Sequence, residues 1–339
     1  MDIVVLVIGL GSMGKRRIRN LQAIGVTQIW GVDVRADRRE EAKKTYKIKT
    51  SDNFDAVINQ IGFNALVISL PPDIHHIYMK KAIDIGIPAF IEASVVDTDF
   101  ELMIQKANER GVLLAPSCTL CFHPAIKKIN DIVKNGELGT ISNYLYHSGQ
   151  YLPDWHTYEK VSEYYVSNKA TGGAREIVPF ELTWITKLLG FPDRVVGFYK
   201  KAIELEGADQ IDDTYNMLLD YKGFIFNLSV DVVSRCATRR LTINGDKKQL
   251  YWCWDDNMIK LFDGVTNNWE NIEYEIVSAQ SGYNKNITEQ MYIDEMTAFL
   301  NAIINGTNFP NSMIEDQRVL KILYDVEKSS DSNKIQNYL

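Results

Sequence analysis

The first fourteen residues, MDIVVLVIGLGSMG, restrict this chain to a small group of folds. The apolar run at residues 3–8 suits a parallel strand that is buried on both faces, and three glycines follow it at G-x-G-x-x-G spacing. The first glycine permits a tight bend, the second lets the backbone approach a pyrophosphate, and the third lets the next helix pack closely. That helix, expected at residues 14–23, would direct its N-terminal N–H groups at the phosphates. The turn residues expected at a dinucleotide are Gly9, Gly11, Ser12, Met13 and Gly14.

An acidic residue follows at the position where dinucleotide-binding domains hold a ribose. The apolar stretch at residues 29–32 ends in Asp33, about 20 residues beyond the glycines. A carboxylate there accepts hydrogen bonds from ribose hydroxyls and repels a 2′-phosphate, which favours NAD. Arg35 and Arg38 could clamp such a phosphate, so NADP stays open as the alternative cofactor.

Charge and hydropathy exclude several classes of protein. The net charge of −7 argues against a nucleic-acid surface and a polybasic membrane patch, so the basic cluster KRRIRN is interpreted as a solvated helix face. No apolar run approaches the roughly 18 residues of a spanning helix, and the short N-terminal run lacks the basic leader of a signal peptide. We therefore expect a cytoplasmic protein. Its four cysteines suit a reducing compartment, and Cys118 and Cys121 lack the second pair of a zinc site, so no metal is expected.

The order of the expected elements divides the chain. Short apolar runs alternate with helical stretches over the first 120 residues, which predicts a doubly wound parallel sheet. Beyond them, alternating segments predict a large, mainly antiparallel open sheet, with a long helix at residues 172–190 between its strands. The expected fold is therefore α/β, with a Rossmann domain at 1–120 and a second α/β domain at 121–311. The segment 312–339 is expected to form a helix that packs back on the first domain, followed by a mobile polar tail, SSDSNK.

Several longer motifs resemble one family over nearly the whole chain. They are VIGLGSMGKRRIRNL at the start, VISLPPDIH, IEASVV, CFHPAIKKINDIVKNGELG, YLPDWHTYE and FELTWITKLLG. Together they resemble the Gfo/Idh/MocA family of nicotinamide-dependent oxidoreductases. The segment YLPDWH looks like a subgroup associated with bacterial surface-sugar gene clusters.

The resemblance implies a fold, a cofactor and a substrate class. The fold is a Rossmann domain followed by a substrate-binding domain whose open sheet joins copies of the chain, so a homodimer or homotetramer is expected. The cofactor is NAD, with NADP as the alternative, and the small-molecule partner is a sugar or nucleotide-sugar. The chemistry is hydride transfer between a carbinol or keto carbon and nicotinamide C4, while a general base takes the hydroxyl proton.

The motifs also carry site positions. Pro71 and His75 match a P-x-x-x-H turn at the cofactor, and Glu92 matches a position that seats the nicotinamide ribose. His75 could instead be a helix-start residue without ligand contact. Glu92 could instead be a carboxylate bonded to backbone. Arg175, if buried, needs an anion from the ligand or from the protein. The cofactor residues expected beyond the glycine turn are Asp33, Arg35, Leu70, Pro71, His75 and Glu92. The substrate residues expected are Tyr151, Trp155, Arg175 and Phe180.

One position departs from the family pattern. The family usually has Glu-Lys-Pro at the end of the fifth strand, where the lysine handles the proton, but the segment here is Glu92-Ala93-Ser94. Alanine cannot transfer a proton. A histidine often found in the long helix of the second domain is matched here by Phe180. Both of the family's proton handlers are therefore expected to be absent.

Three interpretations of this departure stay open. In the first, the chain is a dehydrogenase or reductase that uses another acid–base residue, namely His156, Asp154 or Glu181. His156 is the residue type that titrates closest to neutral, whereas Glu181 would need desolvation and would otherwise pair with Arg175 or a lysine. In the second, the protein binds cofactor and ligand as a regulator or a partner subunit. In the third, it is a non-redox enzyme that holds NAD tightly.

Overall fold

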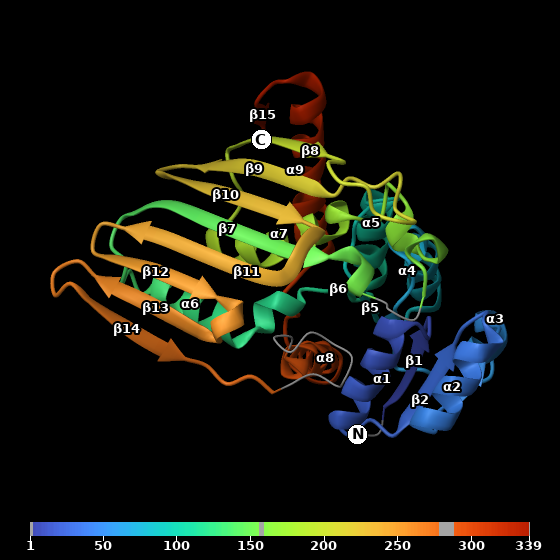
Figure 1. The fold of residues 1–339 in the computed structure, drawn as a ribbon. Helices are drawn as coiled ribbons and strands as arrows, with labels where there is room; N and C mark the ends of the chain where they lie inside the picture. Colours follow the sequence, from blue (N-terminus) through green and yellow to red (C-terminus); the bar gives the residue numbers. More distant parts are fainter. Residues whose placement is uncertain (1–2, 156–158, 278–287, 339) are drawn as a thin grey trace. The chain divides into compact units, whose positions relative to one another are not determined.

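The computed structural model describes residues 3–155, 159–277 and 288–338 (Figure 1). The chain divides into two compact units. The first unit comprises Met1–Thr119 and Tyr292–Gln317, and the second unit comprises Leu120–Met291 and Arg318–Leu339. The boundary after Thr119 lies one residue before the predicted one. The C-terminal part of the chain differs from the prediction, because residues 292–311 belong with the first unit and residues 318–339 with the second.

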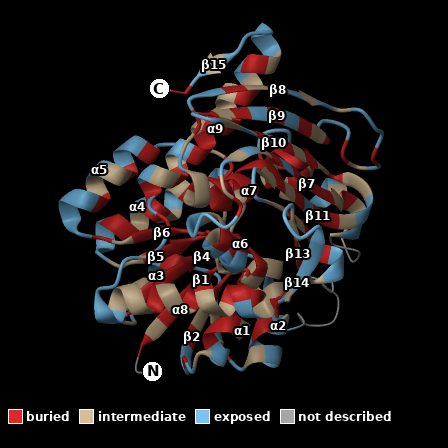
Figure 2. Ribbon diagram, turned by 90° about the vertical axis from the view of Figure 1, so that its left-hand side faces the viewer, coloured by how far each residue is buried: buried red, intermediate tan, exposed pale blue. Residues whose placement is uncertain are grey.

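The first unit is built on a parallel sheet. Within the described residues it has six strands in the order β3-β2-β1-β4-β5-β6, which confirms the predicted doubly wound parallel sheet. All five residues of β1 are apolar and four of them are buried, which suits a central strand (Figure 2). The strands are β1 (Val4–Ile8), β2 (Gln28–Val32), β3 (Lys49–Ser51), β4 (Ala65–Ile68), β5 (Ala89–Ile91) and β6 (Leu114–Pro116). The helices are α1 (Ser12–Ala23), α2 (Ala36–Tyr46), α3 (Phe54–Ile58), α4 (His75–Ile85), α5 (Phe100–Arg110) and, from Tyr292 onward, α8 (Glu289–Asn305).

The core of the first unit joins residues from distant parts of the sequence. Val5 and Val7 of β1, Ile18 of α1 and Phe299 of α8 belong to one buried cluster. Burying a side chain of this size stabilises a fold by about 1.5–3 kcal/mol. The cluster therefore holds α1 and α8 against the sheet and fixes the carboxyl end of β1, where the glycine turn begins.

The second unit is built on one large sheet. Its strand order is β14-β13-β12-β11-β7-β10-β9-β8-β15, nine strands within the described part of the chain. Only β7 and β10 pair in parallel among these neighbours, which confirms a mainly antiparallel open sheet. The strands are β7 (Ile141–Tyr151), β8 (Arg194–Lys200), β9 (Thr214–Tyr221), β10 (Phe224–Asp231), β11 (Val233–Gly245), β12 (Lys248–Cys253), β13 (Met258–Asp263), β14 (Asn268–Glu273) and β15 (Gln336–Asn337). The helices are α6 (Pro124–Lys134), α7 (Ala174–Leu189) and, from Arg318 onward, α9 (Met313–Ser332).

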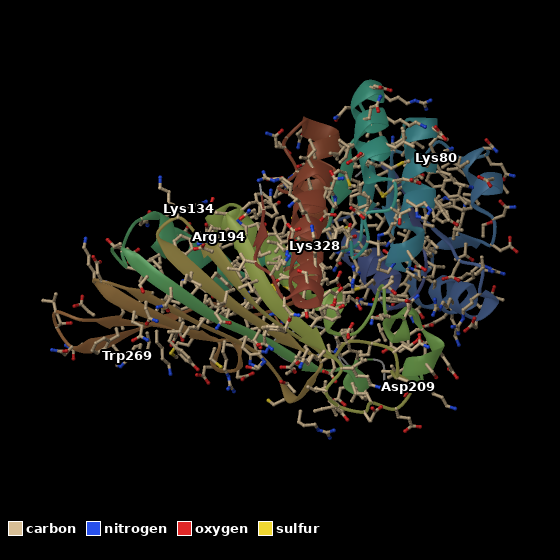
Figure 3. The ribbon with its side chains drawn as sticks, turned by 90° about the horizontal axis from the view of Figure 1, so that it is seen from above. Lys80, Lys134, Arg194, Asp209, Trp269 and Lys328 are labelled. Carbon is tan, nitrogen blue, oxygen red and sulfur yellow. The ribbon has the colours of Figure 1, made fainter. Side chains whose placement is uncertain are left out.

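Alternation along the strands gives this sheet one covered face and one exposed face. In β7, Tyr144 and Tyr146 are buried while Leu145 between them is exposed. α7 packs against β9 and β10, and its internal Pro179 is buried. The edge strand β14 carries the exposed Trp269, which projects from the ribbon in Figure 3. The residues of α7 that face the sheet are therefore the ones placed to build a buried site.

The C-terminal tail differs from its prediction. The polar segment that was expected to be mobile is helical as far as Ser332. Ser329 within it is buried, and its Oγ accepts a hydrogen bond from the N–H of Gly197 (3.3 Å). Polarity alone did not predict the burial of Ser329, because its partner Gly197 lies on a strand that is distant in the sequence. Within the described residues, none of the helices combines the length and the apolar character that crossing a membrane requires.

Candidate functional site

The glycine turn joins β1 to α1 at the carboxyl end of the first unit's sheet. Gly9 has a φ of 90°, and its N–H donates to the carbonyl of Val32 (2.8 Å). A Cβ at Gly9 would lie 2.3 Å from the carbonyl oxygen of Ser69, and one at Gly14 would lie 1.8 Å from that of Gly9. Because any larger residue would collide there, only glycine allows this close turn. The turn fits the pyrophosphate of a dinucleotide, and α1 starts directly behind it at Ser12.

Asp33 lies beside this turn. Its Oδ2 accepts from the N–H of Leu10 and its Oδ1 from the N–H of Arg35, both at 2.8 Å. These bonds hold the carboxylate at the end of β2, where a ribose hydroxyl can donate to it. The guanidinium of Arg35 pairs with Asp37 (2.6 Å), whereas Nη1 of Arg38 lies 3.8 Å from the Asp33 carboxylate. Of the two arginines named from the sequence, Arg38 is thus the one beside the ribose position.

His75 belongs to the turn that follows β4. Its Nε2 lies 2.8 Å from the carbonyl oxygen of Leu70, and its side chain is buried. Burial lowers the pKa of His75, so the ring is neutral near pH 7 and Nε2 donates this bond. His75 therefore supports the backbone of Leu70 and Pro71, and its described contact is with the protein itself.

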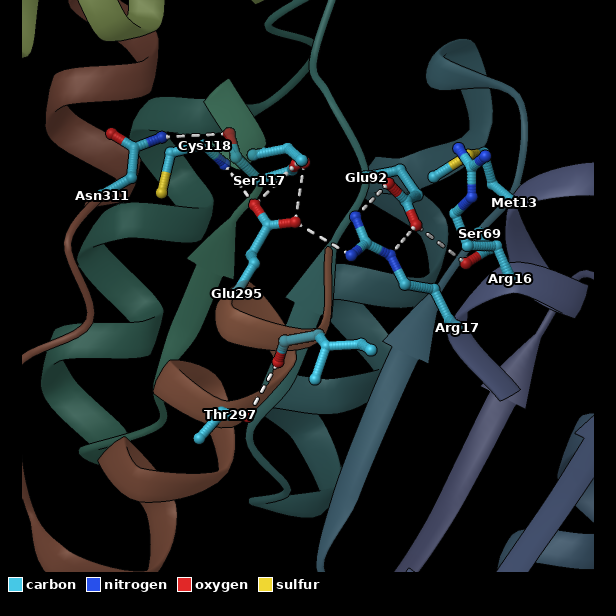
Figure 4. Close-up of polar contacts among 12 residues, drawn as sticks. Met13, Arg16, Arg17, Ser69, Glu92, Ser117, Cys118, Glu295, Thr297 and Asn311 are labelled. Atoms are coloured by element: carbon cyan, nitrogen blue, oxygen red, sulfur yellow. Dashed lines mark hydrogen bonds and ion pairs between the residues drawn. The ribbon is translucent and has the colours of Figure 1, made fainter. Parts of the chain in front are cut away.

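A buried ion network lies at the same edge of the sheet (Figure 4). Arg17 of α1 is completely buried and donates to both oxygens of Glu92, through Nε (2.6 Å) and Nη2 (2.9 Å). Its Nη1 lies 2.9 Å from Oε2 of Glu295 on α8. Burial alone would lower the pKa of Arg17, but the two carboxylates hold it above its ordinary value. The other donors to Glu295, at 2.6–2.9 Å, are Ser117, Cys118 and Thr119.

This network changes the expected role of Glu92. Both of its oxygens are engaged by Arg17, and the hydroxyl of Ser69 donates to one of them (3.2 Å), so within the described residues the partners of this carboxylate are side chains. Ala93 follows, and then Ser94, which is 5% exposed. The Oγ of Ser94 has no hydrogen-bond partner among the described residues. A buried hydroxyl left without a partner at a strand end fits a ligand that brings its own polar groups, as a nicotinamide or its ribose does.

Glu181 forms the centre of a second buried network, in the middle of α7. It is completely buried and accepts from Tyr146 Oη (2.7 Å), Ser148 Oγ (2.8 Å), Trp184 Nε1 (3.0 Å) and Arg239 Nε (2.8 Å). The charge partner is Arg239 of β11, where the sequence suggested Arg175 or a lysine. These four donors satisfy the carboxylate within the protein. These surroundings suit a structural ion pair better than a proton-transfer group.

Arg175 is buried and pairs with an anion of the protein itself. Its Nε lies 2.7 Å from Oε1 of Glu327 on α9, and Tyr215 donates to the same oxygen (3.0 Å). Its Nη1 donates to the carbonyl of Ala170, and the ring of Tyr324 lies 5.6 Å away. The buried guanidinium of Arg175 does have an anionic partner, as expected. That partner is the carboxylate of Glu327, so no ligand is needed to neutralise it.

The other residues expected at the substrate are spread over β7, α7 and the segment after β7. Phe180 and Tyr151 each face an arginine, whose guanidinium carbon lies 6.0 Å and 4.0 Å from the respective ring centre. Trp155 has a buried Nε1 without a hydrogen-bond partner in the described ranges, which leaves it available to a ligand. Asp154 is exposed. His156 lies outside the described residues.

Three charged side chains that the sequence analysis did not single out take part in these clusters. Arg17 lies within KRRIRN, where a solvated face was expected, yet it is completely buried. Glu295 lies on a helix whose pairing with the first unit was not foreseen. Glu176, in the first turn of α7, accepts a hydrogen bond from Tyr165 (2.6 Å), and burial raises its pKa to about 7. No spacing rule marks these residues, because their partners lie on other elements, 75 residues away for Arg17 and Glu92 and 11 for Glu176 and Tyr165.

The cysteines and the acidic side chains give no metal centre in the described part of the chain. No group of three or more His, Cys, Asp or Glu residues there is arranged to hold an ion. Cys118, Cys121, Cys236 and Cys253 are free thiols.

Comparison with known families covers both units. Residues 3–117 match the oxidoreductase family with the NAD-binding Rossmann fold, and residues 126–251 match the GFO/IDH/MocA C-terminal domain. Among curated relatives, the uncharacterised oxidoreductase YrbE of Bacillus subtilis is 31% identical over 145 residues, covering 41% of this chain and 42% of that protein. The myo-inositol 2-dehydrogenase of Thermotoga maritima is 28% identical over 147 residues, covering 39% of this chain and 41% of that protein. The chain thus spans about two fifths of the curated relatives it matches.

Solved structures share the fold over the whole chain. An oxidoreductase from Agrobacterium radiobacter in complex with NAD⁺, L-tartaric acid and magnesium superposes with a TM-score of 0.87 at 11% identity, covering 100% of this chain and 99% of that one. Levoglucosan dehydrogenase in complex with NADH and levoglucosan gives 0.85 at 13% identity, with 99% of each chain covered. With a glycine turn and ribose-side carboxylate in one unit, an open mixed sheet in the other, and matches to both domain families, the chain belongs to the Gfo/Idh/MocA family of NAD-binding oxidoreductases.

Proposed function

We propose that this protein is an NAD-dependent dehydrogenase or reductase that moves a hydride at a carbinol or keto carbon of a sugar or nucleotide-sugar. The observation that carries the proposal is the glycine turn with Asp33 tied to the N–H of Leu10 (2.8 Å). The substrate class is supported by relatives named for inositol, a dTDP-linked deoxysugar and levoglucosan.

The first unit supplies the groups for the cofactor. N–H groups at the start of α1 would bind the pyrophosphate, and Asp33 would accept the adenine-ribose hydroxyls. The hydroxyl of Ser94 would bind the nicotinamide end, and the pairing of Glu92 with Arg17 would keep that strand end in place. When bound there, NAD⁺ would supply a hydride acceptor and NADH a hydride donor. NADP is the weaker alternative, since Arg38 next to Asp33 is the cation available to a 2′-phosphate.

The exposed face of the second unit's sheet is proposed to join copies of the chain into a homodimer or homotetramer. Leu145, Phe198, Leu218 and Ile225 are exposed at outward positions of four neighbouring strands, β7 to β10. Pairing would remove this apolar surface from water. Light scattering of the purified protein would give the copy number, and Leu218→Glu should lower it. We place the protein in the cytoplasm, in keeping with its free thiols.

The experiment that tests the function is a substrate screen with the nucleotide content measured in parallel. The protein is incubated with NAD⁺ or NADH and a panel of sugars, keto-sugars and nucleotide-sugars, and the nicotinamide absorbance is followed. We expect a net redox change with at least one of them. Conversion of a sugar without net redox change, with NAD retained on the protein, would instead indicate a non-redox enzyme. Binding of NADH and sugar without any conversion would indicate a regulator or partner subunit.

A further inference from the structure

Asp33 and Arg38 bring two opposite selectivity elements to one ribose position. A carboxylate at this strand end accepts from the 2′-hydroxyl of NAD, whereas a nearby arginine accommodates the 2′-phosphate of NADP. Here Nη1 of Arg38 lies 3.8 Å from Oδ2 of Asp33. Both residues and the glycine turn beside them belong to the first unit. The contacts that choose between the two nucleotides therefore lie within that unit.

The guanidinium of Arg38 lies over the glycine turn. A Cβ on Gly11 would lie 3.4 Å from Nη1 of Arg38 and 3.8 Å from its Cζ. Among the described residues, apart from the chain neighbours of Gly11, no other heavy atom comes within 4 Å of that position. Gly11 is the glycine whose backbone approaches the phosphates. The side chain of Arg38 is 28% exposed, so a ligand bound at the turn can reach its guanidinium.

The other two arginines of this segment are directed elsewhere. Arg35 donates to Asp37 through Nε (3.1 Å) and Nη2 (2.6 Å). Nη1 of Arg39 donates to two backbone carbonyls just beyond β2, at 2.8 and 2.9 Å, and so supports the chain there. Of the three arginines, Arg38 is the one with a guanidinium beside the ribose carboxylate of Asp33.

Asp33 keeps room for a ribose although the protein already engages it. Its Oδ2 accepts from the N–H of Leu10 and its Oδ1 from the N–H of Arg35, both at 2.8 Å. A carboxylate offers about four acceptor positions, so each oxygen can also accept from a ribose hydroxyl. A 2′-phosphate at this position meets the carboxylate and the guanidinium of Arg38 side by side. The cation offsets the repulsion that the carboxylate alone would exert.

We propose that this site takes both NAD(H) and NADP(H), and that Arg38 is the residue that admits the 2′-phosphate. The inference rests on the proposed function and specifies the cofactor choice of the same site. With NAD(H), Asp33 accepts from the ribose hydroxyls while Arg38 stays beside the carboxylate. With NADP(H), the planar guanidinium pairs with the 2′-phosphate. Because both kinds of bond involve a charged group and are similar in strength, NADH should bind more tightly than NADPH by no more than about tenfold.

Arg38→Met tests this assignment in fluorescence titrations with NADH and NADPH. The variant keeps the length of the side chain and removes its charge. NADPH affinity should therefore fall by about ten- to a hundredfold, while NADH affinity changes little. Asp33→Asn should do the reverse, weakening NADH by about tenfold and leaving NADPH as tight or tighter. Lys43→Met is the matched control, since it removes an exposed cation from the last turn of the same helix and should change neither affinity.

A shorter ligand separates the adenosine half of the site from the rest. Adenosine 2′,5′-bisphosphate carries the 2′-phosphate but no nicotinamide. From the wild-type protein it should displace NADH more strongly than adenosine 5′-monophosphate does. Added salt should weaken it more steeply than the monophosphate, because salt screens a partly exposed charge pair. Arg38→Met should lose both differences, which a merely structural role of Arg38 would not produce.

The outcomes distinguish this inference from the proposed function. A wild-type preference for NADH above about tenfold would overturn the inference and leave the proposed function standing. Unchanged NADPH affinity in Arg38→Met would do the same. Absence of binding by both nucleotides would overturn the proposed function and the inference with it. Should Arg38→Met not fold, Arg38→Gln decides, because it also removes the charge and unchanged NADPH affinity there would overturn the inference.

Discussion

Helix α7 carries two glutamates less than two turns apart whose surroundings are opposite. Glu181 receives four side-chain donors, including the guanidinium of Arg239, whereas Glu176 receives one, from Tyr165. In the first unit, Glu92 and Glu295 resemble Glu181, because they share Arg17. Burial alone does not say how an acid is neutralised; the cations and donors around it do.

The largest effect is expected at Glu181. Glu181→Gln leaves the guanidinium of Arg239 buried without its carboxylate, which should lower the free energy of unfolding by about 3–5 kcal/mol. Urea unfolding followed by circular dichroism measures this loss. A loss under about 1 kcal/mol, the size of an exposed pair, would remove the distinction between the two glutamates.

The first unit should respond in the same way. Arg17→Met leaves two buried carboxylates without a cation, and we expect a loss of about 3 kcal/mol. Lys15→Met is the matched control on the same helix, since Lys15 pairs with the exposed Glu41 (2.9 Å). That control should cost under about 1 kcal/mol. Equal losses in the two variants would show that the Arg17 network does not hold the strand end of Glu92.

Glu176→Gln should change stability in the opposite direction. The pKa of Glu176 is about 7 in the folded protein and 4.5 ordinarily, so between these values the folded state holds a proton that the unfolded state releases. Wild-type stability therefore falls as the pH rises through this interval, and Gln avoids that fall. We expect the variant to be more stable than wild type by about 3 kcal/mol above neutral pH, and the difference to vanish below the ordinary pKa of 4.5. A pH-independent difference would mean that Glu176 titrates normally.

The smallest effect is expected at Tyr165. Tyr165→Phe removes the donor that partly offsets the burial of Glu176, so the pKa of Glu176 should rise further. The variant should lose about 1 kcal/mol at alkaline pH, where Glu176 is ionised, and less at acidic pH. Urea unfolding at several pH values measures this dependence. Equal losses at all pH values would indicate that Tyr165 contributes packing and does not interact with the Glu176 carboxyl.

The sequence predicted the parts of this molecule that depend on local pattern. The apolar run of β1, the glycine spacing and Asp33 follow each other within one strand–helix–strand unit, so their joint position could be inferred without a structure. The ion networks could not be inferred in this way, since 178 residues separate Ser117 from Glu295 and 58 separate Glu181 from Arg239. From the sequence alone, a charged residue on a helix is expected to be solvated. Its burial becomes visible only when the element that covers it is known.

The same limit explains why Glu176 was missed. The neighbouring Arg175 would be expected from the sequence to pair with an acid close to it. In the structure Arg175 instead pairs with Glu327 on α9 (2.7 Å). Glu176 differs from Glu181 in that its Oε2 has no hydrogen-bond partner among the described residues, and only the structure reveals this. The family resemblance suggested Glu181 instead, an acid that pairs with Arg239 in the structure.

The most direct measurement is an equilibrium titration of the wild-type protein with NADH and NADPH, followed by nicotinamide fluorescence, with Asp33→Ala alongside. We expect saturable binding, stronger for NADH than for NADPH, and a loss of NADH affinity of about tenfold or more in Asp33→Ala, since the bonds to a charged acceptor are removed. Absence of binding by either nucleotide would contradict the assignment of the glycine turn as a cofactor site, and with it the dehydrogenase function.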